Sequence, residues 1–101
     1  MPEIKIYDVV RSGEVSGSVT AKQLPDVGSI RMVQFVAPYD NTGYVYIGGP
    51  GVTKPDGTTD TTTGIPLRAG DATPLMPVPR LDIFYIICDN AGDDVLYIAV
   101  A

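Results

Sequence analysis

Three groups of side chains in this 101-residue chain have the types and spacing that chemistry could use. The first is the run from Gly48 to Lys54, Gly-Gly-Pro-Gly-Val-Thr-Lys, which has the composition of a phosphate-binding loop. It lacks the Gly-Lys-Ser/Thr ending of such loops, and no helical pattern follows that would point a helix N-terminus at a phosphate. Plain turn glycines, needed where the backbone takes positive φ, are therefore the favoured interpretation.

The second group is acidic and could supply oxygen ligands to calcium. It comprises Asp89, Asn90, Asp93 and Asp94. The spacing and the terminal glutamate of an EF-hand loop are missing. Asp and Asn are also typical residues of tight turns, so a hairpin turn is the favoured interpretation. The sequence leaves open whether this turn, or the loop over residues 48–64, binds an ion.

The third group is aromatic, and its rings could stack on sugars or bases. It comprises Tyr39, Tyr44, Tyr46, Tyr85 and Tyr97. Strand alternation places Tyr44 and Tyr46 on one face, with Val45 and Ile47 on the other. Tyrosine is also a favoured strand residue and interface anchor. A place in the core or at a subunit contact is therefore favoured over a ligand platform.

The chain has no histidine and one cysteine, which excludes the commonest catalytic and metal-binding sets. Without histidine there is no Ser-His or Cys-His pair, and structural zinc has no ligand set. Cys88 follows Ile86 and Ile87, so we expect a buried, unreactive thiol that forms no intrachain disulfide. No pair of carboxylates stands out as a hydrolytic pair. The sequence predicts a protein that is not an enzyme, with no catalytic, cofactor or metal residue assigned.

Composition indicates one domain over residues 1–101 that associates with partners. Hydrophobic residues make up 45% of the chain and charged residues only 19%, below the usual quarter. A surface this poor in charge is expected to be partly covered in an oligomer or on another protein. The net charge is −5, and the seven cations are scattered along the chain, which argues against nucleic acid as a partner.

Targeting signals are not apparent. The sequence begins Met-Pro-Glu-Ile-Lys-Ile-Tyr, without the basic and apolar blocks of a signal peptide. No apolar run approaches the roughly 20 residues needed to span a bilayer. We expect synthesis in the cytoplasm and no membrane partner.

The pattern of elements predicts an all-β fold, a small sandwich or barrel of antiparallel strands. Residues 1–28 are expected to form an N-terminal strand and arm region, with a turn from Gly13 to Gly17, and residues 29–101 the core strands. We expect a hairpin between strands 30–37 and 44–47, a central buried strand at 83–88, and a last strand at 94–100 after a turn. The strands are expected at residues 4–9, 19–22, 30–37, 44–47, 83–88 and 94–100. A long Gly/Thr-rich loop covers 48–64, and prolines make 73–79 an edge segment.

The order of these motifs resembles small virion structural proteins of tailed bacteriophages, of the capsid decoration, cement or head-fibre type. The matching features cover most of the chain. They are the N-terminal strand, the Leu24-Pro25 step, the strand 30–37, the run Asn-Thr-Gly-Tyr-Val-Tyr-Ile-Gly-Gly-Pro-Gly-Val-Thr at 41–53, the run Gly-Ile-Pro-Leu-Arg-Ala-Gly-Asp at 64–71, and the closing hairpin.

The resemblance implies a compact β domain on the capsid surface of the virion. Such a protein binds the major capsid protein, associates with itself as a homotrimer and stabilises the shell. Two alternatives stay open. One is another virion position, such as a head-tail connector, a tail component or a head-fibre adaptor. The other is a carbohydrate-binding module that uses the tyrosines.

Overall fold

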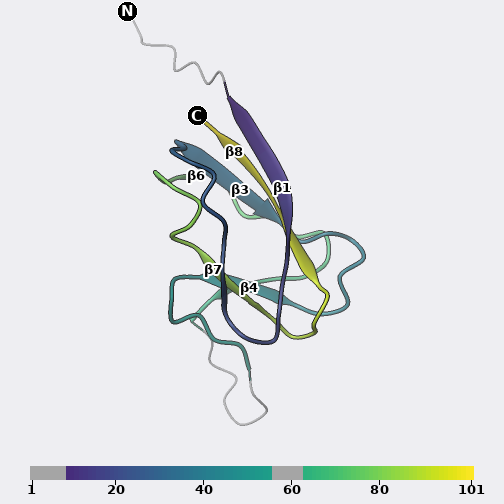
Figure 1. Ribbon diagram of the computed structural model, residues 1–101. Coiled ribbons are helices and arrows are strands. Elements are labelled where there is room, and N and C mark those ends of the chain that lie inside the picture. Colours follow the sequence, from purple (N-terminus) through teal and green to yellow (C-terminus); the bar gives the residue numbers. More distant parts are fainter. Residues whose placement is uncertain (1–8, 56–62) are drawn as a thin grey trace, which may run out of the picture.

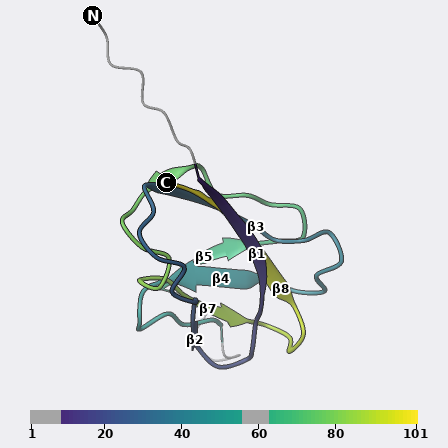
Figure 2. The same ribbon diagram turned by 45° about the horizontal axis from the view of Figure 1, so that its top comes forward.

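The computed structural model describes residues 9–55 and 63–101, which form two antiparallel four-stranded sheets without a helix (Figures 1 and 2). The predicted all-β class is confirmed, and the two sheets give a sandwich-like arrangement. Sheet A has the strand order β1 (Val10–Ser16), β8 (Asp94–Val100), β3 (Met32–Val36) and β6 (Met76–Pro77). Sheet B has the order β2 (Lys22–Gln23), β7 (Tyr85–Cys88), β4 (Val45–Gly48) and β5 (Ile65–Leu67).

Alternation along the strands gives the core, because every second side chain points between the sheets. Phe35, Val33 and Val95 are fully buried on the inner face of sheet A, and Val45 and Ile86 are buried opposite them on sheet B. The ring of Phe35 meets Phe84 edge-on, with centroids 5.0 Å apart. Cys88 is also buried in this core, as its apolar neighbours predicted.

Two glycines in the N-terminal half of the chain, which were expected to form a turn, have a different role. The predicted turn from Gly13 to Gly17 is wrong, since β1 runs through to Ser16 and pairs with β8 along its whole length. Gly13 lies opposite Tyr97, and a Cβ there would come within 2.8 Å of the Tyr97 hydroxyl. A Cβ at Gly17 would collide with the Cys88 sulfur. These glycines therefore permit close packing, Gly13 within β1 and Gly17 directly after it, which a sequence pattern does not distinguish from a turn.

Other predicted N-terminal features are only partly covered by the described residues. The strand expected at 4–9 lies outside them except for Val9. The strand expected at 19–22 is found shifted, as β2. Residues 10–24, expected within the N-terminal region, bring Val15 and Leu24 into the core.

The predicted strand pairings are wrong, although the strands themselves are present. Strand β3 pairs with β8 and β6, whereas β4 pairs with β7 and β5, so the expected hairpin between 30–37 and 44–47 does not form. The closing strands β7 and β8 also lie in different sheets and are not a hairpin. The reason is that the loops between these strands cross from one sheet to the other. The alternation of apolar and polar residues shows which face of a strand is buried, but it does not show which strands lie beside it.

Several placements within the sheets are confirmed. Strand β7 is central, between β2 and β4, and β8 lies between β1 and β3. The proline-rich segment forms the edge strand β6. Residues 49–55 and 63–64 of the predicted long loop contain no strand, and its remaining residues, 56–62, lie outside the description.

Three crossings between the sheets meet at one end of the sandwich, on the turn that precedes β8. The Asp93 carbonyl accepts the Gly17 amide at 2.7 Å, which ties down the link from β1 to β2. The Asp93 carboxylate accepts the amides of Thr42 at 3.0 Å and Gly43 at 2.8 Å, in the link from β3 to β4. Asn41 and Asp94 exchange two further bonds, at 2.8 and 2.9 Å. Asp93 is 5% exposed, so its oxygens replace water for amides that would otherwise lack a partner.

We expect Asp93→Ala to lower the free energy of unfolding by about 2–4 kcal/mol, because two amides lose their acceptor in a site with little water. Urea unfolding followed by circular dichroism measures this change. Asp40→Ala is the control, since Asp40 is an exposed residue of the adjoining loop, and a change below about 0.5 kcal/mol is expected. Equal effects of the two substitutions would contradict the role given to Asp93.

Candidate functional site

The acidic turn is a structural clamp in which the carboxylates of Asp89 and Asp93 already have donors. Besides the contacts of Asp93, the Asp89 carboxylate accepts the Tyr44 amide at 3.2 Å and the Tyr46 hydroxyl at 3.2 Å. The side-chain amide of Asn90 donates to the Thr42 hydroxyl at 3.1 Å. An oxygen that faces an N–H donor is poorly placed for a cation. Within residues 9–55 and 63–101, no group of three or more His, Cys, Asp or Glu side chains is arranged to hold a metal ion.

The glycine-rich run after β4 covers the outer face of sheet B. Val52 is 5% exposed and packs with Tyr46, Ile87 and Tyr85. Thr53 and Thr63 join the two ends of the loop, each amide donating to the other's hydroxyl at 3.0 and 3.2 Å. The predicted reason for these glycines, a backbone with positive φ, is wrong. Among the described glycines, positive φ occurs at Gly28, Gly70 and Gly92. This run therefore presents a packed valine, in place of the row of amides that a phosphate requires.

The tyrosines are divided between different surfaces. Tyr44 and Tyr46 share a face as predicted, with ring centroids 6.0 Å apart, but Tyr46 is only 4% exposed. Burial and the neighbouring Asp89 carboxylate raise the pKa of Tyr46 to about 12. Tyr97 packs in the other sheet, over Gly13, and Tyr85 is half-buried. Tyr39 and Tyr44 present exposed rings, and they do not make a flat platform with the rest.

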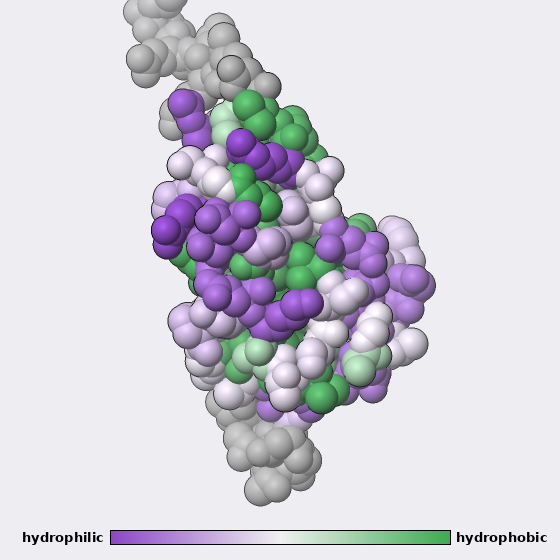
Figure 3. All heavy atoms as spheres, in the orientation of Figure 1, coloured by the Kyte–Doolittle hydropathy of each residue, from purple (hydrophilic) through white to green (hydrophobic). Residues whose placement is uncertain are grey.

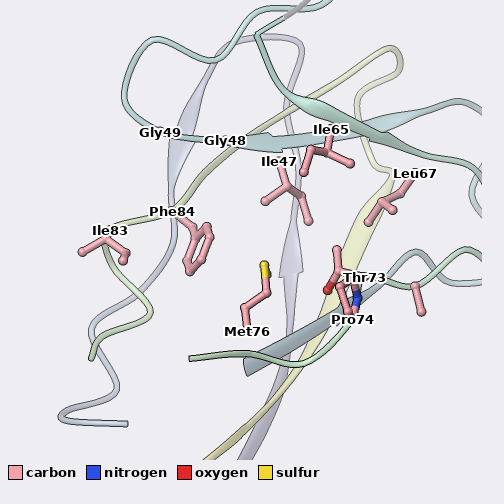
Figure 4. Close-up of a pocket in the computed structure, with 11 residues that line it drawn as sticks. Ile47, Gly48, Gly49, Ile65, Leu67, Thr73, Pro74, Met76, Ile83 and Phe84 are labelled. Carbon is pink, nitrogen blue, oxygen red and sulfur yellow. The ribbon is translucent and has the colours of Figure 1, made fainter. Parts of the chain in front are cut away.

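An apolar cleft opens between the edges of the two sheets, where β5 and β6 lie (Figure 4). Its volume is about 460 Å³. Ile47, Ile65 and Leu67 point into it from sheet B, toward Met76 on the β6 segment, and Phe84 borders it on one side (Figure 4). The lining residues are Ile47, Gly48, Gly49, Ile65, Leu67, Ala72, Thr73, Pro74, Met76, Ile83 and Phe84.

The cleft has no free polar side chain with which to do chemistry. The Thr73 hydroxyl accepts the Phe35 amide at 3.0 Å, and no other side chain in the lining carries a polar N or O atom. Two apolar residues stand at its rim, where Ile65 is 59% exposed and Ile83 is 38% exposed. Sites that hold small apolar groups are concave and apolar in this way. The described lining can therefore accept apolar side chains of a partner.

Sequence reasoning missed this cleft because its walls come from separate segments. Strands β4 and β5 supply one wall, residues 72–76 the opposite wall, and residues 83–84 the end. The feature of the sequence that could have indicated the cleft is its high density of prolines. Strands β5 and β6 are 3 and 2 residues long, and Pro66 and Pro77 lie within them. Short strands leave the facing sheet edges uncovered on this side.

The outer face of sheet A is a second exposed apolar surface. The register aligns three rows of side chains across β1, β8 and β3, and they are listed here in that strand order. They are Val10, Val100 and Met32; Ser12, Ile98 and Gln34; and Glu14, Leu96 and Val36. Val10 is 64% exposed and Ile98 is 42% exposed. Apolar atoms gather where β1 begins, near the end of β8 (Figure 3). No described segment lies over this face as Val52 lies over sheet B.

One acidic contact lies at the edge of that face. A side-chain hydrogen bond with Asp94, and the charge of Asp94, raise the pKa of Glu14 above its usual value of 4.5. Glu14 therefore keeps its proton to higher pH than an isolated glutamate does. Glu14 is a solvated group, and this contact does not form a buried acid-base pair.

Comparison with known proteins gives no relative: no family model, no curated protein and no solved structure matches the chain. No helix in the described part of the chain is long and apolar enough to cross a membrane. The site is therefore interpreted from its own geometry.

We expect the Cys88 thiol to be unreactive in the folded protein. Burial, followed by the nearby Asp93 and Asp94 charges, raises the pKa of Cys88 from 9.0 to about 11. At pH 8 a chromogenic disulfide reagent should react about 100-fold more slowly than with the chain unfolded in guanidinium, because the thiolate is about 100-fold scarcer. Equal rates would contradict the buried placement.

The same shift gives a dependence of stability on pH. The folded thiol stays protonated to higher pH than the unfolded thiol, so its contribution to stability is complete below about pH 9 and is lost toward pH 11. Cys88→Ala removes the thiol, so its free energy of unfolding, measured against pH, gives the reference curve.

Proposed function

We propose that this chain is a structural protein of a tailed-bacteriophage virion, a decoration protein that binds the major capsid protein and stabilises the shell without catalysis. The observation that carries the proposal is the apolar cleft between β5 and β6, which has exposed apolar residues at its rim and no free polar side chain. The resemblance in the order of motifs supplies the identity of the partner. The low charge of the chain, 19% of its residues, supports a surface that is covered in use.

The cleft would act by accepting apolar side chains from a segment of the capsid protein. Its volume of about 460 Å³ is enough for a few such side chains. Each Leu, Ile or Phe side chain that becomes fully buried contributes roughly 1.5–3 kcal/mol before the cost of association is counted. One such contact is weak, but a shell presents the same segment many times by symmetry. Linked copies then bind far more tightly than a single copy does.

The alternatives use the same molecule differently. A connector, a tail component or a head-fibre adaptor could use the same cleft, and the number of copies per virion would separate these positions from decoration. A carbohydrate-binding role would depend on exposed aromatic rings. It is the weaker candidate, because Tyr46 is buried and its hydroxyl is held by Asp89.

The test is binding to capsid shells that lack this protein, prepared from the phage whose genome encodes it. Co-sedimentation should show binding by the natural chain. Ile65→Ser, at the rim of the cleft, should weaken binding tenfold or more, because burial of one apolar side chain is worth at least about 1.4 kcal/mol. Val19→Ser is the matched control, since Val19 is also exposed, at 46%, and does not line the cleft.

Two results would overturn the proposal. One is the absence of the chain from purified virions. The other is equal binding by both variants, which would move the contact away from the cleft.

A further inference from the structure

Strand β1 is a long sheet edge without the features that protect the other edges. Strand β5 contains Pro66 and β6 contains Pro77, and a proline cannot donate a ladder hydrogen bond. Strand β2 has two residues and is followed closely by Pro25. By contrast, β1 has seven residues and no proline, and among the described strands it has a partner on one side only. Figures 1 and 2 both show it at the outside of its sheet. Such an edge is a ready template for another strand.

The hydrogen bonds of β1 show which of its groups face outward. Val9 exchanges both of its backbone bonds with Ala101, at 3.1 and 2.9 Å. In an antiparallel ladder such pairs alternate, so the odd-numbered residues of β1 bond to β8. The bond from the Gly17 amide to the Asp93 carbonyl follows the same pattern, in which odd-numbered residues bond toward β8. The amides and carbonyls that point away from β8 are therefore those of Val10, Ser12, Glu14 and Ser16.

The edge is complementary to a second copy of itself. If two β1 strands pair antiparallel with Gly13 opposite Gly13, all seven residues of each strand are matched. Val10 then faces Ser16, and Ser12 faces Glu14, so these outward-facing pairs can exchange two backbone bonds each. The Ser12 hydroxyl is positioned to donate to the Glu14 carboxylate, and no acid directly faces another acid. Strand β1 holds one cation, Arg11, and one anion, so its formal charge is zero in a chain of net charge −5.

Open space separates the C-terminal half of the β1 edge from the β2 segment. A hollow of about 330 Å³ lies between β1 and β2, lined by Glu14, Val15, Ser16, Lys22, Gln23 and Pro25. Lys22 donates to the Ser16 carbonyl at 2.9 Å, and that oxygen keeps a second lone pair. Pairing would also place the exposed Val10 of each copy beside Ser16 of the other, on one continuous sheet face.

We propose that two copies of this chain associate through their β1 edges, antiparallel about a two-fold axis at Gly13, so that two copies of sheet A form one continuous sheet. The partner is a second copy, and the pairing requires nothing from the capsid. It therefore stands or fails independently of the proposed function. A closed two-fold pair differs from the homotrimer that the resemblance implies.

The first experiment measures the mass of the purified full chain in solution by light scattering. The natural chain should have the mass of two copies, and Ser12→Pro should have the mass of one. The Ser12 amide points away from β8, so a proline there blocks pairing while the ladder within the chain is kept. Ser12→Ala keeps the amide and should stay dimeric. A monomeric natural chain at the highest soluble concentration, a mass of three copies, or an unchanged mass for Ser12→Pro would each overturn the proposal.

The second experiment tests the register and does not need the proline variant to fold. Ser12→Cys and Glu14→Cys are made separately, mixed and oxidised. Position 12 faces position 14 of the other copy, so the mixture should give a disulfide-linked dimer well above the level that either variant gives alone. Cys88 is buried and stays out of the reaction. Equal cross-linking in the mixture and in the separate samples would overturn the register.

Discussion

The hydrogen bonds of Asp93 hold the two sheets in place at one end of this molecule. Its main-chain carbonyl fixes the passage from β1 to β2, and its carboxylate fixes the passage from β3 to β4. Asp93 itself lies in the passage from β7 to β8. One buried residue therefore joins all three crossings. In the passage from β3 to β4 its acceptor is the charged carboxylate, which makes stronger bonds to amides than a neutral acceptor does. Because β7 and β8 are the central strands of their sheets, this clamp fixes the middle of both.

The apolar cleft lies away from this clamp, where the sheets are less constrained. Strands β5 and β6 are short because Pro66 and Pro77 limit ladder formation, so the sheets do not close over the core there and the apolar cleft remains. On sheet B, the segment carrying Val52 folds back and covers Tyr46 and Ile87. On sheet A, no described segment does the same for Ile98. Asp93 thus satisfies the backbone amides at one end of the molecule, while apolar surface stays exposed at the cleft and on sheet A, which is the arrangement that the proposed association would require.

Much of the fold could be predicted from the sequence, because each strand carries its own alternation. The runs that became β3, β4, β7 and β8 were recognisable one by one, as was the proline-rich edge. Their pairing was not, because the link from β3 to β4 and the turn at Asp93 both cross between sheets. The acidic residues that resembled a calcium site or a hairpin turn became the acceptors of that crossing. Gly13 was mistaken for a turn because its reason, the ring of Tyr97, lies on another strand.

The cleft and the β1 edge lie at opposite edges of the strand order, and this decides how they could work together. In sheet A, β1 is the first strand and β6 the last, with β8 and β3 between them. A pair formed through β1 would therefore leave both clefts uncovered, one on each outer side. A dimer of this kind has two apolar sites on a rigid frame, because the paired sheets share one ladder of hydrogen bonds. If the proposed binding to a capsid shell holds, occupation of the first cleft would keep the second cleft near the shell at a high effective concentration. Weak burial at each cleft can then give firm attachment only if neighbouring capsid segments have a spacing that matches the dimer.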